Sequence, residues 1–365
     1  MRILVLPGDG IGPEITAATL EVLRAVDAAL SLRLEFEERD IGLASLRTQG
    51  TTLPKDILTR IEKVDGVILG PVSHYEYPSL EEGGVNPSGA LRSAFDLYAN
   101  IRPCRSREGL TILRKPMDLV IMRENTEGFY ADRNMFSGSG EFMPDPDMAL
   151  SLRKITAKGS HRIARAAFEL ALRRRRKVTA VHKANVLKLS DGLFLREVRK
   201  VAADYPGVLF EDVIVDAVAA LLIREPDRFD VIVTTNMFGD ILSDEASELS
   251  GSLGLGGSIN AGDRVCIAQA QHGSAPDIAG RNKANPTSLI LSAAMLLAWR
   301  GRKDQDAALE RAGAVIEEAI DRVLADKALR TADLGGPLAT DAFAKAVCAA
   351  LADPRTAGAG ANPPP

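Results

Sequence analysis

One stretch of the chain indicates its fold class: Val231-Ile-Val-Thr-Thr-Asn236-Met-Phe-Gly239-Asp240-Ile-Leu-Ser-Asp244 predicts a buried strand, a turn and the start of a helix. Similar β-branched runs recur along the chain between segments with helical periodicity. We expect strands at residues 2–6, 66–69, 118–122, 178–181, 213–215 and 230–234, and helices at residues 13–30, 149–175, 190–203, 240–249, 286–299 and 304–324. This alternation is typical of an α/β fold with a substantial parallel sheet.

The bulk composition limits the function classes. The chain has 365 residues, of which 46% are hydrophobic and 26% charged, so we expect a sizeable core and two domains. A formal net charge of −4 argues against a nucleic-acid partner. No run approaches the roughly 20 apolar residues of a membrane span. The three cysteines, Cys104, Cys266 and Cys348, lack disulfide or zinc spacing, which favours a cytoplasmic location.

Three carboxylates are candidate metal ligands. Asp240 and Asp244 are four residues apart, so they share one helix face, where like charges repel unless a cation lies between them. Oxygen ligands of this kind suit magnesium or manganese. The alternative is that acidic residues simply favour the first turn of a helix. Asp216 follows the expected strand 213–215, at the strand edge where ligand sites of α/β proteins form.

Three arginines are candidates for binding an acidic substrate. Arg92 and Arg102 flank a segment, residues 93–101, that we expect to be helical, and Arg123 follows the strand 118–122. Guanidinium groups bind carboxylates in a bidentate manner, so three of them around one site would hold a di- or tricarboxylic acid. For any one of them a surface salt bridge is the alternative, and only their convergence is informative.

Two residues beyond strand ends are candidates for proton transfer. Tyr130 follows the run Arg123-Glu-Asn-Thr-Glu-Gly-Phe, and Lys183 follows the strand 178–181. A lysine placed beside other cations can act as a base, and a tyrosine can donate a proton. For each residue alone, a packing or surface role is the alternative.

A glycine-rich loop, Pro7-Gly-Asp-Gly-Ile-Gly12, joins the first strand to the first helix. Its glycines run G-x-G-x-G, whereas a dinucleotide fingerprint is G-x-G-x-x-G with an acidic residue about 20 positions later. A tight strand-to-helix turn is the alternative to a pyrophosphate site. We therefore expect any cofactor site to lie mainly elsewhere.

The chain resembles the isocitrate/isopropylmalate dehydrogenase family, which are metal-dependent decarboxylating dehydrogenases and include homoisocitrate and tartrate or D-malate enzymes. Six blocks carry the resemblance: GDGIGPE (8–14), DLYANIRP (96–103), RENTEG (123–128), HKANV (182–186), NMFGDILSD (236–244) and HGSAPDIAG (272–280). Each block is modest alone, and together they are very specific. The similarity extends from residue 2 to about residue 351.

The resemblance implies an isopropylmalate-dehydrogenase-like fold of two α/β domains around a cleft, without the usual Rossmann fingerprint. The first, cofactor-binding domain would comprise residues 1–98 and 251–352, and the second, for dimerisation, metal and substrate, residues 99–250. The Gly-, Ala- and Pro-rich residues 353–365 predict a disordered tail. The resemblance also implies a homodimer in which Lys183 and Asp216 of each subunit form part of the active site of the other subunit.

The resemblance also implies roles for the candidates. Arg92, Arg102 and Arg123 would bind the malate part, Asp216, Asp240 and Asp244 would bind Mg2+ or Mn2+, and Tyr130 and Lys183 would transfer protons. The cofactor would be NAD, since an acidic group at Asp277 repels a 2'-phosphate. Its adenosine would lie against a set of loop residues: His272, Gly273, Ala275, Asp277, Ile278 and Asn285.

The residues before Arg92 bear on the substrate. The positions of Ser88 and Gly89 lack the apolar leucines of isopropylmalate enzymes, and Asn86 with Ser88 resembles the Ser/Asn pair that receives the third carboxylate of isocitrate, with identities exchanged. This favours a polar-substituted or unsubstituted malate over 3-isopropylmalate, which stays the alternative. Gln269-Ala270 replaces a usual Glu-Pro. A catalytically retired homologue is the alternative from another class, but no acid, base or arginine is missing.

Overall fold

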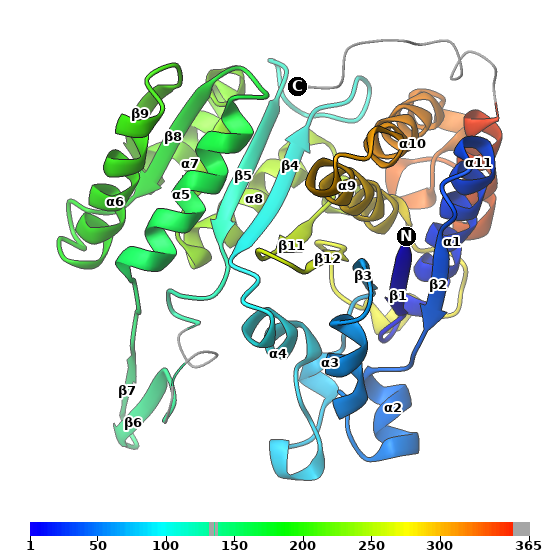
Figure 1. Cartoon of the computed structure of the whole chain (residues 1–365), viewed down its shortest axis with the longest axis horizontal. Coiled ribbons are helices and arrows are strands. Elements are labelled where there is room, and N and C mark those ends of the chain that lie inside the picture. The colour runs from blue at the N-terminus through cyan, green and yellow to red at the C-terminus, as the bar shows by residue number, and fades with distance from the viewer. Residues whose placement is uncertain (131–134, 136–137, 353–365) are drawn as a thin grey trace.

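The computed structural model describes residues 1–130, 135 and 138–352. The predicted disordered tail, residues 353–365, lies outside the described residues. Ten strands of the described chain form one continuous sheet in the order β2-β1-β3-β12-β11-β4-β5-β10-β8-β9 (Figure 1). Their bounds are β1 Arg2–Leu6, β2 Glu35–Glu38, β3 Gly66–Leu69, β4 Ala99–Arg105, β5 Asp118–Glu124, β8 Lys177–His182, β9 Leu209–Ile214, β10 Val231–Thr234, β11 Ile259–Ala261 and β12 Cys266–Gln269.

The sheet is parallel towards both ends and antiparallel in its middle. β2, β1, β3 and β12 pair in parallel, as do β5, β10, β8 and β9. The β12–β11, β11–β4 and β4–β5 pairs are antiparallel. The expected α/β class with a substantial parallel sheet is therefore confirmed.

Helices cover both faces of the sheet, which is the usual condition for parallel strands. α1, α9, α10 and α11 pack with Ile3 and Val5 of β1, whereas α3 and α4 pack with Leu4 and Leu6 on the other face. In the other half, α5 and α6 cover one face of β5 and α7 and α8 the opposite face. The helix bounds are α1 Gly12–Leu30, α2 Gly42–Gln49, α3 Lys55–Ile61, α4 Pro87–Ala94, α5 Ala157–Ala171, α6 Ser190–Asp204, α7 Val215–Arg224, α8 Asn236–Ser250, α9 Thr287–Asp304, α10 Ala307–Ala325 and α11 Thr340–Leu351.

A two-stranded hairpin of β6 (Glu141–Asp145) and β7 (Met148–Ser151) extends away from the body of the molecule (Figure 1). All nine of its strand residues are exposed, including Phe142, Met143, Met148 and Leu150. The helix expected from residue 149 was wrong at its start: β7 occupies residues 148–151, and the helix begins only at Ala157, after the capping side chain of Thr156.

One further element prediction was wrong, and one expected strand has different bounds. Residues 93–101 are not one helix: α4 ends at Ala94, and β4 begins at Ala99 because its backbone pairs with β11 and β5 on both sides. This tertiary pairing overrides the local helical pattern. The strand expected at 213–215 is β9, which ends at Ile214, and Val215 already begins α7.

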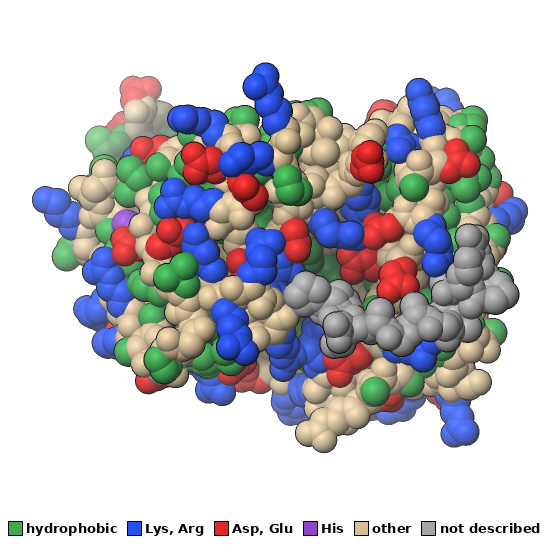
Figure 2. All heavy atoms as spheres, turned by 90° about the horizontal axis from the view of Figure 1, so that it is seen from above, with side chains coloured by type: hydrophobic (Ala, Val, Ile, Leu, Met, Phe, Trp, Pro, Cys, Tyr) green, Lys and Arg blue, Asp and Glu red, His purple; other side chains and the backbone are tan. Residues whose placement is uncertain are grey.

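The remaining expected strands and helices lie where they were predicted, with ends shifted by up to five residues. The two-domain division, residues 1–98 with 251–352 and residues 99–250, stays a prediction. No helix of the described residues is long and apolar enough to cross a membrane. Figure 2 shows basic and acidic side chains interspersed over one face of the molecule.

Candidate active site

Asp240 lies in the first turns of α8, the helix that follows β10 directly. The helix approaches the neighbouring strand β5 closely at Gly239, where a Cβ atom would come within 2.7 Å of the Arg123 side chain. Only glycine permits this approach, which brings the Arg123 guanidinium to the start of α8.

Arg123 is buried and fully engaged at the start of α8. Its Nε and Nη2 atoms donate to Oδ1 of Asn236, at 2.9 and 2.7 Å, and its Nη1 donates to Asp240. The side chain is 2% exposed. Asn236 in turn donates from Nδ2 to the carbonyl of Glu127, at 3.1 Å. The arginine is thus held in one orientation before any ligand binds.

Arg102 joins the two aspartates of α8. Its Nη1 lies 3.0 Å from Oδ1 of Asp244 and 3.2 Å from Oδ1 of Asp240, and it also donates to the Ser243 hydroxyl at 2.7 Å. Its Nε donates to Oδ1 of Asn100 at 2.6 Å. Because Arg102 is only 7% exposed, its charge acts on both carboxylates with little screening by water.

The pKa values of the two aspartates are shifted in opposite directions. Burial raises the pKa of Asp240, but Arg123, Arg102 and Arg92 together hold it below its ordinary value. Burial raises the pKa of Asp244 above its ordinary value, against the opposing charge of Arg102 and with the repulsion of Asp240. Two of the three predicted substrate arginines, Arg102 and Arg123, therefore contact one aspartate, and the charge of Arg92 also lowers the pKa of that carboxyl.

Tyr130 completes this cluster. Its hydroxyl donates to Oδ2 of Asp240 at 3.3 Å, and its ring lies 5.8 Å from the Arg123 guanidinium carbon. The carboxylate accepts a hydrogen bond and the guanidinium cannot, so the phenol proton points towards Asp240.

Lys183 and Asp216 form a separate pair. The Lys183 ammonium donates to Asp216, and this contact lowers the pKa of that carboxyl. The Lys183 backbone N–H donates to the buried Asp191 at 2.6 Å, which fixes the start of this loop. No group of three metal-ligating His, Cys, Asp or Glu side chains forms within the described residues, so Asp216 is not brought to Asp240 and Asp244 in one chain.

The predicted cofactor residues lie on the connection from β12 to α9. Ser274, within the run from His272 to Ile278, accepts a hydrogen bond from the Ile11 N–H of the glycine loop at 2.8 Å. A Cβ at Gly10 would come within 2.0 Å of the Ser274 carbonyl, so the glycine loop serves the close packing of these two loops. Ala275 has a left-handed φ of 38°, and Gly273 and Asp277 are exposed.

His272 and Asn285 differ in how many of their polar side-chain atoms have hydrogen-bond partners within the protein. Nε2 of His272 is buried without a hydrogen-bond partner among the described residues, and burial lowers the pKa of this imidazole. Asn285 uses both ends of its amide: Nδ2 donates to Asp333 at 3.0 Å, and Oδ1 accepts from the Thr287 N–H at 3.0 Å. Asp333, in the 3-10 helix η8 (Ala332–Leu334), was not predicted from the sequence.

Asn86 and Ser88 lie at the start of α4, one to two turns before Arg92. Asn86 is the N-cap, and its side chain accepts from the Gly89 N–H at 3.3 Å. The Ser88 hydroxyl donates to Oε1 of Gln269, at the end of β12, at 3.1 Å.

Sequence reasoning missed the residues that hold the arginines. Asn236 fixes Arg123, and Asn100 and Ser243 fix Arg102. Asn236 has a usable signal, because a buried asparagine directly after a strand and at a helix start favours a site. Asn100 has none, since its place in the middle of the sheet depends on pairing with β11 and β5.

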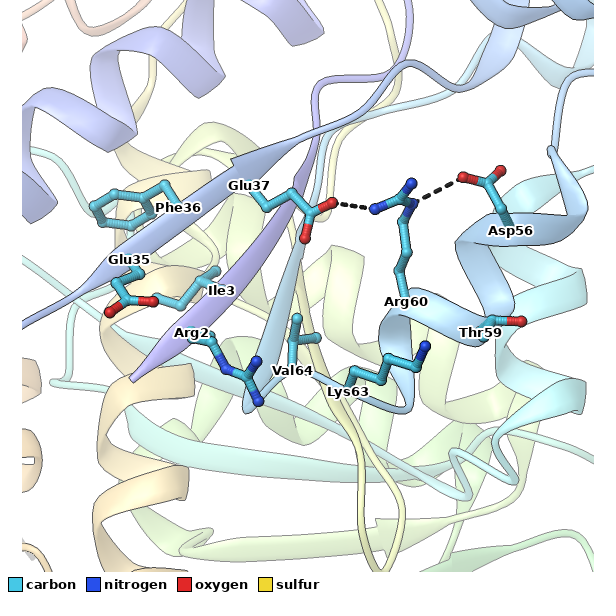
Figure 3. A pocket seen from close by; sticks show the side chains of 10 residues that line it. All are labelled: Arg2, Ile3, Glu35, Phe36, Glu37, Asp56, Thr59, Arg60, Lys63 and Val64. Carbon is cyan, nitrogen blue, oxygen red and sulfur yellow. Dashed lines mark hydrogen bonds and ion pairs between the residues drawn. The ribbon is translucent and has the colours of Figure 1, made fainter.

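Two pockets lie away from this cluster. One of about 400 Å3 lies between β1, β2 and α3, where Arg60 is paired with Glu37 and Asp56 (Figure 3). The other, of about 590 Å3, is lined by residues from α3, α9 and the β11–β12 turn. None of the predicted site residues lines either pocket.

Two buried arginines, Arg102 and Arg123, paired with the carboxylates of Asp240 and Asp244 form an arrangement suited to a small anionic molecule. Comparison with known proteins gives the class directly. The sequence matches the isocitrate/isopropylmalate dehydrogenase family over residues 2–347, and the chain belongs to that family.

Relatives within the family differ in their substrates. The chain is 42% identical to 3-isopropylmalate dehydrogenase of Methanothermobacter thermautotrophicus, covering 97% of this chain and 99% of that protein. It is 44% identical to isocitrate/homoisocitrate dehydrogenase of Thermus thermophilus, covering 96% of this chain and 98% of that protein. A solved structure of isocitrate dehydrogenase from Methylococcus capsulatus matches with a TM-score of 0.84 and 39% identity, covering 96% of this chain and 99% of that one.

The protein is therefore a decarboxylating dehydrogenase that acts on a CH–OH group, as the family and the relatives' names indicate. Dehydrogenases of this family generally use NAD(P) and Mg2+ or Mn2+. The predicted family and enzyme class are confirmed, and the acid remains to be assigned.

Proposed function

We propose that the protein catalyses the NAD- and Mg2+- or Mn2+-dependent oxidative decarboxylation of a malate-type 2-hydroxy acid whose C3 carries a polar group or none. Isocitrate, homoisocitrate, tartrate and D-malate belong to this class. The observation that carries the proposal is the contact of both Arg102 and Arg123 with Asp240, a carboxyl whose pKa the charge of Arg92 also lowers. Three guanidinium groups at one site match the two or three carboxylates of such an acid.

The donor set fits a divalent cation. Asp240 and Asp244 present partly exposed carboxylates on one helix face, at 33% and 49% side-chain exposure, and hard oxygen ligands are those that Mg2+ and Mn2+ prefer. Asp216 would be the third ligand. When bound, the cation supplies Lewis-acid stabilisation of negative charge on the substrate's hydroxyl and keto oxygens.

The chain's own groups handle the protons. Lys183 would take the proton of the C2 hydroxyl as hydride leaves C2, and the resulting β-keto acid would lose carbon dioxide. Tyr130, whose hydroxyl already points to Asp240, would return a proton to the carbon that lost the carboxylate. The arginines keep the acid in place between these steps.

The loop from His272 to Ile278, with Asn285, would hold the adenosine part of NAD. The buried, unpartnered Nε2 of His272 is a polar group that a bound nucleotide can satisfy. The exposed carboxylate of Asp277 would repel a 2'-phosphate and accept ribose hydroxyl groups, which favours NAD over NADP.

A homodimer would bring Lys183 and Asp216 to the neighbouring Asp240. Large apolar side chains near these residues are exposed: Val186 at 64% and Leu189 at 89% follow Lys183, and Ile241 at 59% follows Asp240. In the proposed dimer these apolar side chains would be covered by the neighbouring subunit, which removes them from water. The exposed hairpin of β6 and β7 would be part of the same interface. We also propose a cytoplasmic location, in line with three unpaired cysteines.

A second candidate substrate is 3-isopropylmalate. It is favoured by the 42% identity to an enzyme of that name. The polar residues Asn86 and Ser88 on α4, where an isopropyl group would need apolar contacts, argue for the first candidate.

The test is a substrate panel. Purified protein is incubated with NAD, Mn2+ and, separately, D-malate, tartrate, isocitrate, homoisocitrate and 3-isopropylmalate, and NADH formation is followed. We expect turnover on at least one of the first four acids, with the highest kcat/KM among them. No turnover on any acid by folded protein would support the retired homologue, and a preference for 3-isopropylmalate would support the second candidate.

A further inference from the structure

Two short segments of the chain lie side by side before α5. The tyrosine segment, residues 127–130, ends in Tyr130, and the strap, residues 153–156, leads directly into α5. Gly128 of the tyrosine segment and Lys154 of the strap exchange two backbone hydrogen bonds, at 2.8 and 2.9 Å. The position of the tyrosine segment therefore depends on the strap.

Glu127 connects the two segments through its side chain. Its Oε2 accepts a hydrogen bond from the Thr156 N–H at 2.8 Å, and its Oε1 accepts one from the Thr156 hydroxyl. The same hydroxyl accepts from the Gly159 N–H at 3.0 Å and caps α5. Because Glu127 is only 6% exposed, a displaced carboxylate would leave buried oxygen atoms without donors.

The main chain of Glu127 is held as well. Its N–H donates to Oε2 of Glu124 at 2.8 Å, and its carbonyl accepts from Nδ2 of Asn236 at 3.1 Å. The other carboxylate oxygen of Glu124 accepts from the N–H and the hydroxyl of Thr126, at 2.9 and 2.6 Å. Every polar atom of Glu127 thus has a partner among the described residues, and the strap supplies both partners of its side chain.

The tyrosine segment ends at the aspartates of α8. The Tyr130 hydroxyl donates to Oδ2 of Asp240 at 3.3 Å, which is longer than the usual hydrogen bond between a hydroxyl and a carboxylate. The direction of the ring therefore depends strongly on the backbone that carries it. A proton donor works only within hydrogen-bond reach of the atom that it protonates, so a shift of the segment would slow that step.

We propose that Glu127 is a positioning residue: through Thr156 it holds the tyrosine segment so that the Tyr130 hydroxyl reaches the carbon that has lost carbon dioxide. The inference rests on the proposed function, in which Tyr130 returns a proton to that carbon. Glu127 acts here as a hydrogen-bond acceptor and not as an acid or base, because donors of the strap occupy both of its oxygens.

Gly159 offers a substitution that moves the Glu127 carboxylate directly. A Cβ atom at Gly159 would lie 2.7 Å from the carboxyl carbon of Glu127, whereas alanine itself favours the helix. Gly192 is the third residue of α6, as Gly159 is the third residue of α5, and a Cβ there would meet no atom outside its own helix within 4 Å. Gly159→Ala and Gly192→Ala are therefore matched substitutions, and only the first displaces the carboxylate.

The test is a double-mutant cycle with Tyr130→Phe, in which kcat is measured at saturating acid and NAD. We expect Gly159→Ala alone to lower kcat by about tenfold or more, with the KM for the acid changed by less than about threefold, because the arginines stay in place. In the Tyr130→Phe background it should lower kcat by less than about twofold, because the group that it misplaces is already absent. Gly192→Ala should leave kcat unchanged in both backgrounds.

Two further variants keep the test decisive. Thr156→Val removes the hydroxyl donor and should give the same cycle, even if Gly159→Ala folds poorly. Glu127→Gln can accept from the Thr156 N–H and donate to the hydroxyl oxygen, so its kcat should stay within about threefold of the wild type.

Three results would overturn the assignment in an enzyme that is otherwise active. These are an unchanged kcat in Gly159→Ala or Thr156→Val, equal losses with and without the Tyr130 hydroxyl, and a loss in Glu127→Gln as large as that in Thr156→Val, which would indicate an acid or base. A folded wild type without turnover on any acid of the panel would instead overturn the proposed function, and this inference with it.

Discussion

Asn236 gives a prediction whose size follows from its contacts. It is fully buried and makes three hydrogen bonds: it accepts two from Arg123, at 2.9 and 2.7 Å, and donates one to the Glu127 carbonyl, at 3.1 Å. Asn236→Ala removes all three. With about 1.5 kcal/mol for each charge-assisted bond and about 1 kcal/mol for the neutral one, the free energy of unfolding should fall by about 4 kcal/mol.

The same substitution should reduce catalysis, because Arg123 would keep only its contact with Asp240 among these partners. We expect kcat/KM for the best acid to fall by at least about tenfold, with the NAD affinity unchanged. Urea unfolding gives the stability and steady-state kinetics give kcat/KM. Asn236→Asp retains the acceptor for Arg123 and should recover most of the activity. A loss below about 1 kcal/mol together with unchanged kcat/KM would refute the reasoning.

Three further predictions concern the metal, the dimer and the cofactor loop. Asp240→Asn should cut turnover while leaving NAD affinity nearly intact, measured by fluorescence titration; a large loss of NAD binding would contradict the proposed separation of the two sites. Mixing inactive Lys183→Ala and Asp240→Asn subunits should restore about a quarter of wild-type activity, because half the dimers then hold one complete site; no recovery after verified subunit exchange would exclude shared sites. His272 has its pKa lowered by burial from the ordinary 6.5, so below that pH the unfolded chain binds more protons and stability falls; thermal unfolding at several pH values should show a smaller fall for His272→Gln, and an equal fall would contradict this assignment.

The fold class could be predicted because local pattern and tertiary environment agree over most strands. In β1 and β3 the β-branched residues are buried on both faces, so composition alone identifies the strands. β4 was misread because its residues 99–101 continue a helical pattern, and only pairing with β11 and β5 makes them a strand.

The candidate site could be predicted in part for a similar reason. Asp240, Asp244 and Arg123 lie at element ends, where sequence signals are strong, and Arg102 was proposed on its chemistry. Asn100 and Asn260 contact each other between strands that are far apart in the chain, and no local spacing reports such contacts. The separation of Lys183 and Asp216 from Asp240 in one chain is likewise a property of the folded molecule.

The most direct test of the central claim is the stoichiometry of the reaction. With the best acid of the panel, NAD and Mn2+, NADH and carbon dioxide are measured in the same sample, with and without a chelator and with Asp240→Asn as a control. We predict equal amounts of the two products, and neither product with chelator present. NADH formed without carbon dioxide, or at the same rate after metal removal, would contradict metal-dependent oxidative decarboxylation at Asp240.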